Sequence, residues 1–172
     1  MRNQKDIENE AKKVLVEHGL YSIPVDPVVL VNKLGFKVNN AVFSDESIAG
    51  LTSKRAGKPL FLINQSDHPF RKRFTIAHEL AHHFLHLFED KEDIIHKKID
   101  MFRVPGPPDE AKFLRKERIM EIEANRLAAA LLMPEELVRE QWKISPSVEE
   151  MARIFNVSVE AMGYRVGDLG LE

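Results

Sequence analysis

The stretch RFTIAHELAHHFLHLF, residues 73–88, carries four histidines and one glutamate in an otherwise largely apolar segment. Apolar residues recur in it at helical spacing in two rows, one running from Phe74 to Phe88 and the other from Ile76 to Leu87. A helix that is apolar on two sides lies inside a fold, where polar groups without partners are costly. The stretch therefore predicts a central helix whose polar side chains share a partner.

Within this helix, His78, Glu79 and His82 form an H-E-x-x-H pattern. Residues four apart lie on one helix face, with about 5–6 Å between their Cβ atoms, so both imidazoles reach one ion. Zinc binds histidine nitrogen, and a catalytic zinc site keeps one position for water. Glu79 lies one step round the helix, where it is suited to accept a proton from that water. The pattern indicates a catalytic zinc site; the alternative is a helix with ordinary structural histidines.

The other histidines are expected to have structural roles. His83 points to a different helix face, and His86 lies two turns from His78, roughly 12 Å along the axis. Reaching the same ion would require a chain break after His82, and no glycine provides one. The same expectation holds for His18, His68 and His96.

A third metal ligand is expected from a second helix, in the segment MEIEANRLAAALLMP. Glu121 shares a helix face with Ala124 and Ala128, whose small side chains let a neighbouring helix approach closely. Glu123 lies near Arg126, where the alternative is a solvent-facing ion pair between residues three apart. Helix geometry alone gives Glu121 only a small advantage over Glu123.

Composition narrows the class of protein. With 172 residues, the chain has the length of one ordinary domain. Its net charge of −2 gives no electrostatic reason to expect binding to nucleic acid or to a membrane surface. Cysteine is absent, so any metal is held by histidine and carboxylate. No apolar run reaches the length of a membrane span, and no signal segment is visible. We expect a soluble, cytoplasmic protein.

The remaining segments predict a single α+β domain. Helices are expected over 6–18, 25–35, 110–133 and 134–142, and strands over 36–43, 48–54 and 59–64, with a hairpin loop at 55–58. These segments predict a small antiparallel sheet, a central H-E-x-x-H helix and a core spanning 1–143. The tail, 144–172, reads as a pair of short helices capped by Ser147 and Ser158, with Ser147 and Glu150 forming a capping box.

The apolar segment LFLI, residues 60–63, allows two interpretations. It is either an ordinary core strand or an edge strand along which an extended substrate aligns by β-augmentation. A charged stretch, EDKEDIIHKKIDMFR, begins at Glu89, and the segment VPGPPDE that follows it reads as an exposed loop. No role is assigned to residues 89–118.

The segments RFTIAHELAHHFLH and EIEANRLAAALLMP, in this order and spacing, resemble the ImmA/IrrE family of bacterial and phage metallopeptidases. The resemblance implies a zincin-like core that binds Zn²⁺ through His78, His82 and Glu121, with Glu79 as general base. It favours Glu121 over Glu123, because the family's ligand is the glutamate four residues before the asparagine, here Asn125. It also implies a helix-turn-helix repressor as the substrate or genetic partner.

Two other functions remain open at this point. Zinc could stabilise a regulatory protein that acts by binding a partner without proteolysis. The tail has the helix, turn, helix rhythm of a DNA-binding motif. Its acidic residues outnumber its two arginines, however, which opposes phosphate binding and favours a packed helical pair. The charged residues concerned are Glu149, Glu150, Glu160, Asp168, Arg153 and Arg165.

Overall fold

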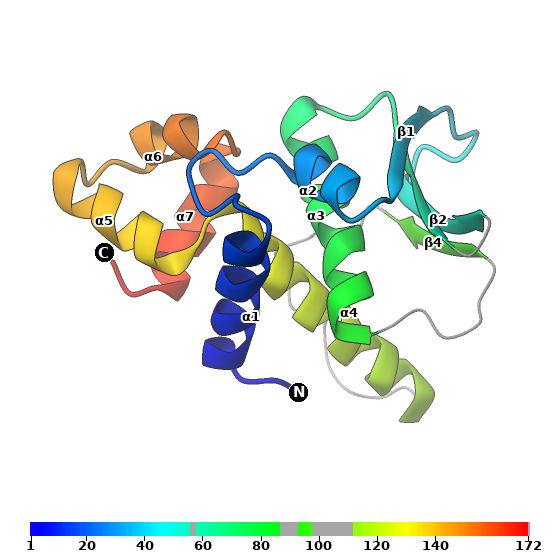
Figure 1. Cartoon of the computed structure of the whole chain (residues 1–172), viewed down its shortest axis with the longest axis horizontal. Coiled ribbons are helices and arrows are strands. Elements are labelled where there is room, and N and C mark those ends of the chain that lie inside the picture. The colour runs from blue at the N-terminus through cyan, green and yellow to red at the C-terminus, as the bar shows by residue number, and fades with distance from the viewer. Residues whose placement is uncertain (56–57, 87–92, 98–111, 172) are drawn as a thin grey trace.

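The computed structural model describes residues 1–55, 58–86, 93–97 and 112–171 (Figure 1). Its helices are α1 (Gln4–Glu17), α2 (Pro27–Lys33), α3 (Pro69–His86), α4 (Lys112–Leu132), α5 (Glu135–Ile144), α6 (Val148–Phe155) and α7 (Val159–Asp168). Its strands are β1 (Lys37–Ala41), β2 (Ile48–Arg55), β3 (Lys58–Asn64) and β4 (Asp93–Lys97). The predicted mixture of helices with a small sheet is confirmed.

The four strands form one sheet in the order β1-β3-β2-β4. Strands β2 and β3 are antiparallel and pair up to Arg55 and Lys58, as the predicted hairpin requires. Strand β1, however, runs parallel to β3, with Lys37 opposite Leu60. The prediction of a wholly antiparallel sheet is therefore wrong. Apolar patterning identifies strands but not their neighbours, and here the chain places β2 on the far side of β3 from β1.

The interpretation of the LFLI segment as an edge strand is also wrong. These residues belong to β3, which lies between β1 and β2. Phe61 and Ile63 are buried against the helices, while Leu60 and Leu62 are half-buried on the other face. Strand β4 was not predicted, because its two adjacent isoleucines are too short an apolar run to stand out among charged residues. The VPGPPDE segment lies outside the described residues.

Helix α3 occupies the centre of the fold, as predicted. It packs against β2 and β3 on one side and against α4 on the other, and α1 packs on α4 (Figure 1). Every residue from Phe74 to His82 is buried. The sheet lies beyond α3, towards one end of the molecule, and helices α5 to α7 lie at the opposite end. Side chains from α3 therefore face both the sheet and α4.

The helix ends follow local sequence chemistry. Asp26 caps α2 by accepting a hydrogen bond of 2.9 Å from the backbone N–H of Val28, and Pro27 is the first helical residue. Gly19 and Gly35 have positive φ angles of 65° and 71° where the chain leaves α1 and α2.

In the tail, Ser147 and Ser158 cap α6 and α7 as predicted. In a capping box the Glu150 carboxylate would also accept a hydrogen bond from the Ser147 N–H, but the structure pairs these two groups differently. The Ser147 N–H donates to the Ser145 carbonyl, and the Glu150 carboxylate accepts from the Ser145 hydroxyl at 2.9 Å.

A buried ion pair ties α7 to α1. Arg165, only 2% exposed, donates to both carboxylate oxygens of Glu8 at 2.7 and 2.8 Å. The same guanidinium donates to the Met133 carbonyl at the end of α4. Met151 and Phe155 of α6 belong to the same apolar core as α3 and α4. In the described part of the chain, no helix combines the length and apolarity that crossing a bilayer requires.

Candidate metal centre

His78, His82 and Glu121 come together at the contact between α3 and α4. The two Nε2 atoms lie 3.0 Å apart, and the Glu121 carboxylate oxygens lie 3.3 Å from Nε2 of His78 and 3.2 Å from Nε2 of His82. Both histidines are buried, while the Glu121 side chain is 32% exposed. The three side chains form a cluster that could hold a metal ion, open to solvent on the Glu121 side.

The donor atoms of this cluster suit a cation better than protons. If both rings donated an N–H to Glu121, two N–H groups would face each other at 3.0 Å. A cation between the three atoms instead accepts a lone pair from each. Burial lowers the pKa of His82 to about 4. Its ring is then neutral at pH 7, which is the form that binds metal. The residues present therefore fit a divalent metal.

Glu79 lies beside this cluster, on the side of α3 that faces the sheet. It is completely buried, and its Oε2 accepts a hydrogen bond from the Thr52 hydroxyl of β2. Burial raises the pKa of Glu79 to about 7, although the charge of His78 and the Thr52 hydroxyl oppose the shift. A carboxyl with this pKa can both take up and release a proton near neutral pH.

Gly50 of β2 lets the sheet approach α3 at Glu79. A Cβ atom added at Gly50 would lie 2.9 Å from Cγ2 of Thr75 and 3.4 Å from Oε1 of Glu79. Sequence reasoning identified neither Gly50 nor Thr52. A lone glycine inside a strand is a known sign of close backbone approach, so the signal was present at Gly50.

Glu123 does not have the solvent-facing environment considered for it from the sequence. It is buried, accepts a hydrogen bond from the backbone N–H of Arg2, and lies 3.2 Å from Nε2 of His86. The alternative of an exposed ion pair with Arg126 is therefore wrong. The structure places Glu121, not Glu123, against His78 and His82.

Two of the other histidines make local contacts away from the cluster. His83 packs edge-on against Phe36, with ring centroids 4.6 Å apart, and His18 lies 2.8 Å from the Val14 carbonyl. The side chain of His96 lies outside the described residues.

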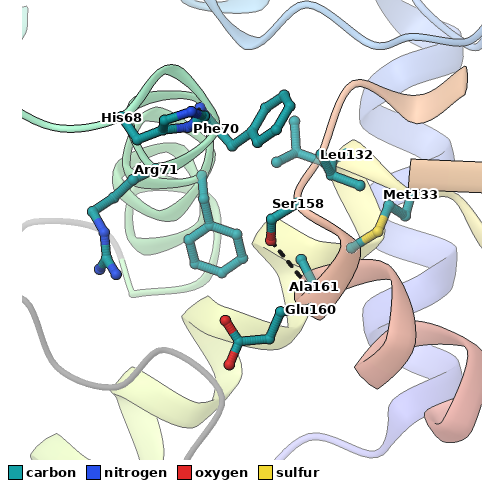
Figure 2. Close-up of a pocket in the computed structure, with 10 residues that line it drawn as sticks. His68, Phe70, Arg71, Leu132, Met133, Ser158, Glu160 and Ala161 are labelled. Carbon is teal, nitrogen blue, oxygen red and sulfur yellow. Dashed lines mark hydrogen bonds between the residues drawn. The ribbon is translucent and has the colours of Figure 1, made fainter. Parts of the chain in front are cut away.

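A hollow of about 210 Å³ opens beside the N-terminal half of α3 (Figure 2). It is bounded by the start of α3, the end of α4 and the start of α7, and its lining is mainly apolar. Phe74 lines the hollow, and its ring also lies beside the ring of His78, with ring centroids 6.5 Å apart. The residues that line it include His68, Phe70, Phe74, Leu132, Met133 and Ala161.

A buried H-E-x-x-H helix facing a carboxylate on a second helix is the arrangement of a metallopeptidase domain. The chain belongs to the Peptidase_M78 family, the IrrE N-terminal-like domain, whose model matches residues 31–166.

Two bacterial relatives agree with this assignment. The chain is 33% identical over 113 residues to the radiation response metalloprotease IrrE of Deinococcus deserti, and 32% identical over 109 residues to that of Deinococcus radiodurans. These matches cover 63% and 61% of this chain, but only 36% and 30% of the relatives. The chain thus matches about a third of each relative's length.

A solved structure described as a Mycobacterium tuberculosis transcriptional regulator has the same fold. The TM-score is 0.62 at 16% sequence identity, and the match covers 94% of this chain and 46% of that one.

Proposed function

We propose that the chain is a zinc-dependent endopeptidase with a zincin-like core. The observation that carries this proposal is the convergence of His78, His82 and Glu121 beside the buried carboxyl of Glu79. Two imidazole nitrogens and one carboxylate form a frequent ligand set for catalytic zinc. The name of the Deinococcus relatives, radiation response metalloprotease, supports the same class of activity.

His78, His82 and Glu121 would hold the zinc ion. Zinc bound there would lower the pKa of a coordinated water towards about 7 and polarise the scissile carbonyl. Glu79 accepts the proton of the attacking water and transfers it to the leaving amine. The Thr52 hydroxyl holds the Glu79 carboxylate in place, and the sheet excludes bulk water from that side.

The hollow beside Phe74 supports a polypeptide substrate. Small-molecule pockets usually measure roughly 300–1,000 Å³, so a space of about 210 Å³ suits a single side chain. Its mainly apolar lining favours an apolar side chain of that substrate.

We propose a cytoplasmic helix-turn-helix repressor as the substrate, on the basis of the resemblance to ImmA/IrrE proteins. Direct DNA binding by the tail is less well supported. Arg165 is buried against Glu8, and the exposed Arg153 is paired with Glu150 at 3.3 Å. Neither arginine is available to a phosphate without losing these contacts. Tight, salt-sensitive retardation of promoter DNA by the isolated protein would favour the DNA-binding alternative.

The test compares Glu79→Gln, Glu121→Gln and the exposed control Glu17→Gln. Each variant is incubated with zinc and a proteome-derived peptide mixture, cleavage is read by mass spectrometry, and bound metal is measured by elemental analysis. Glu79→Gln is expected to keep zinc and lose cleavage, Glu121→Gln to lose both, and Glu17→Gln to match the parent protein. Persistent cleavage by Glu79→Gln would show that Glu79 is not the base. Zinc binding by the parent without any cleavage would favour the non-proteolytic alternative.

A further inference from the structure

A third histidine of α3 extends the row formed by the two proposed ligands. His78, His82 and His86 follow one another at intervals of four residues, so they lie on one helix face. The ring of His82 is between the other two, with centroids 4.5 Å from His78 and 5.3 Å from His86. Only His78 and His82 direct a nitrogen at Glu121.

His86 contacts the back of the His82 ring. Its Nδ1 lies 3.3 Å from Nδ1 of His82, while Nε2 of His82 faces the metal cluster. On its other side, Nε2 of His86 lies 3.2 Å from Oε2 of Glu123. The side chains of His86 and Glu123 are only 9% and 8% exposed. A chain of polar contacts thus runs from Glu123 through His86 to His82.

Donor and acceptor rules allow one consistent proton arrangement in this chain when both rings are neutral. The Glu123 carboxylate only accepts, so Nε2 of His86 carries a proton and donates to it. When His86 is neutral, its Nδ1 has no proton and acts as an acceptor. Nδ1 of His82 then carries a proton and donates it to Nδ1 of His86. The remaining nitrogen of His82, Nε2, therefore presents a lone pair towards Glu121 and the metal position.

We propose that His86 and Glu123 are positioning residues that fix the tautomer and the ring orientation of His82 for metal binding. The proposal rests on the metal site of the proposed function and adds two residues that do not touch the metal. Partners behind ligating histidines commonly change metal affinity by about 10- to 100-fold.

The chain of contacts has a structural anchor. Glu123 also accepts the backbone N–H of Arg2, and the Arg2 guanidinium donates to the Leu85 carbonyl at 3.4 Å. Glu123 is therefore held from two sides and cannot swing away from His86 without losing the Arg2 contact. This anchoring favours a fixed orienting pair over an incidental contact between α3 and α4.

The decisive measurement is zinc affinity, by competition with a chromophoric chelator. His86→Leu removes the acceptor for His82 but keeps an apolar side chain of similar size, whereas His86→Asn keeps an oxygen that can accept at the position of Nδ1. We expect a 10- to 100-fold weaker zinc affinity for His86→Leu and substantial recovery for His86→Asn. His83→Leu, the neighbouring histidine that packs on Phe36, is the control and is expected to leave the affinity unchanged.

NMR of the zinc-bound full chain gives a second readout. The Nδ1 proton of His82 is expected to be hydrogen-bonded to Nδ1 of His86 and so protected from exchange with solvent, and His86→Leu is expected to lose this protection. Thermal unfolding of the metal-free variants identifies any variant that fails to fold, and Glu123→Gln then replaces it. A zinc affinity within twofold of the parent for folded His86→Leu and Glu123→Gln would overturn the inference. If the proposed function itself were wrong, the parent protein would bind no zinc or cleave no peptide, so this outcome can be distinguished from failure of the inference about His86 and Glu123.

Discussion

At the residue scale, the buried carboxyl of Glu79 makes the stability of the metal-free chain depend on pH. Its pKa of about 7 lies above the ordinary value of 4.5, because burial disfavours the charged form. Between these two pH values the folded metal-free chain keeps a proton that the unfolded chain releases. The free energy of unfolding therefore falls as pH rises through this window.

We predict that Glu79→Gln removes this pH dependence from the metal-free protein, because glutamine does not ionise. At pH 8 the variant is expected to be more stable than the parent by on the order of 3 kcal/mol, with little difference at pH 4.5. Urea unfolding in the presence of a chelator, at a series of pH values, measures the effect. Parallel stability curves for the two proteins would contradict the prediction.

How far these residues could be predicted depends on how local their relationships are. The spacing of His78, Glu79 and His82 lies within two helical turns, so a sequence reading places them together. Glu121 comes from another helix, and choosing it over Glu123 needed the family resemblance. The contact of Thr52 with Glu79 depends on how the sheet is seated on α3, which no local pattern specifies.

At the element scale, the approach of β2 to α3 depends on Gly50. We predict that Gly50→Ala destabilises the protein by about 1–3 kcal/mol and reduces peptide cleavage, because the added methyl group would force β2 away from Thr75 and Glu79. Gly163→Ala in α7 is the matched control. A Cβ there meets only Val148 at 3.9 Å, so it is expected to be neutral or stabilising by about 0.5–1 kcal/mol.

Urea unfolding and the peptide-cleavage assay measure both glycine variants. Equal stability of Gly50→Ala and the parent would show that β2 can shift without cost, and the close approach would then have no role in the site.

The helices were easier to predict than the sheet for a physical reason. Each helix carries its own start and stop chemistry, such as Asp26 before α2 and Ser158 before α7. Strand order is decided by contacts between distant segments. The parallel pairing of β1 with β3 therefore left no mark in the local pattern.

At the scale of the whole molecule, the pair formed by Arg165 and Glu8 joins the two ends of the described chain. We predict that Arg165→Met lowers the free energy of unfolding by about 3–5 kcal/mol, because it leaves the Glu8 carboxylate and the Met133 carbonyl without their buried donor. The combined change of Arg165→Met with Glu8→Met is expected to recover most of the loss.

Arg153→Met is the control for this pair. Its side chain is 77% exposed and its contact with Glu150 is a surface ion pair, so its loss is expected to cost less than about 1 kcal/mol. Urea denaturation at neutral pH compares all four proteins. A loss for Arg165→Met no larger than that for Arg153→Met would mean that the tail is not held by this contact.

The hollow lined by Phe74 has a practical consequence for inhibitor chemistry. A compound that joins a metal-chelating head group to a short aliphatic arm could bind at His78, His82 and Glu121 and extend into the hollow. Joining two weak fragments raises affinity through effective concentration, provided that the linker spans the two positions. Because the end of α4 and the start of α7 form part of the wall, the arm would contact surfaces outside the H-E-x-x-H helix, and these contacts could make the compound selective for this member of the Peptidase_M78 family.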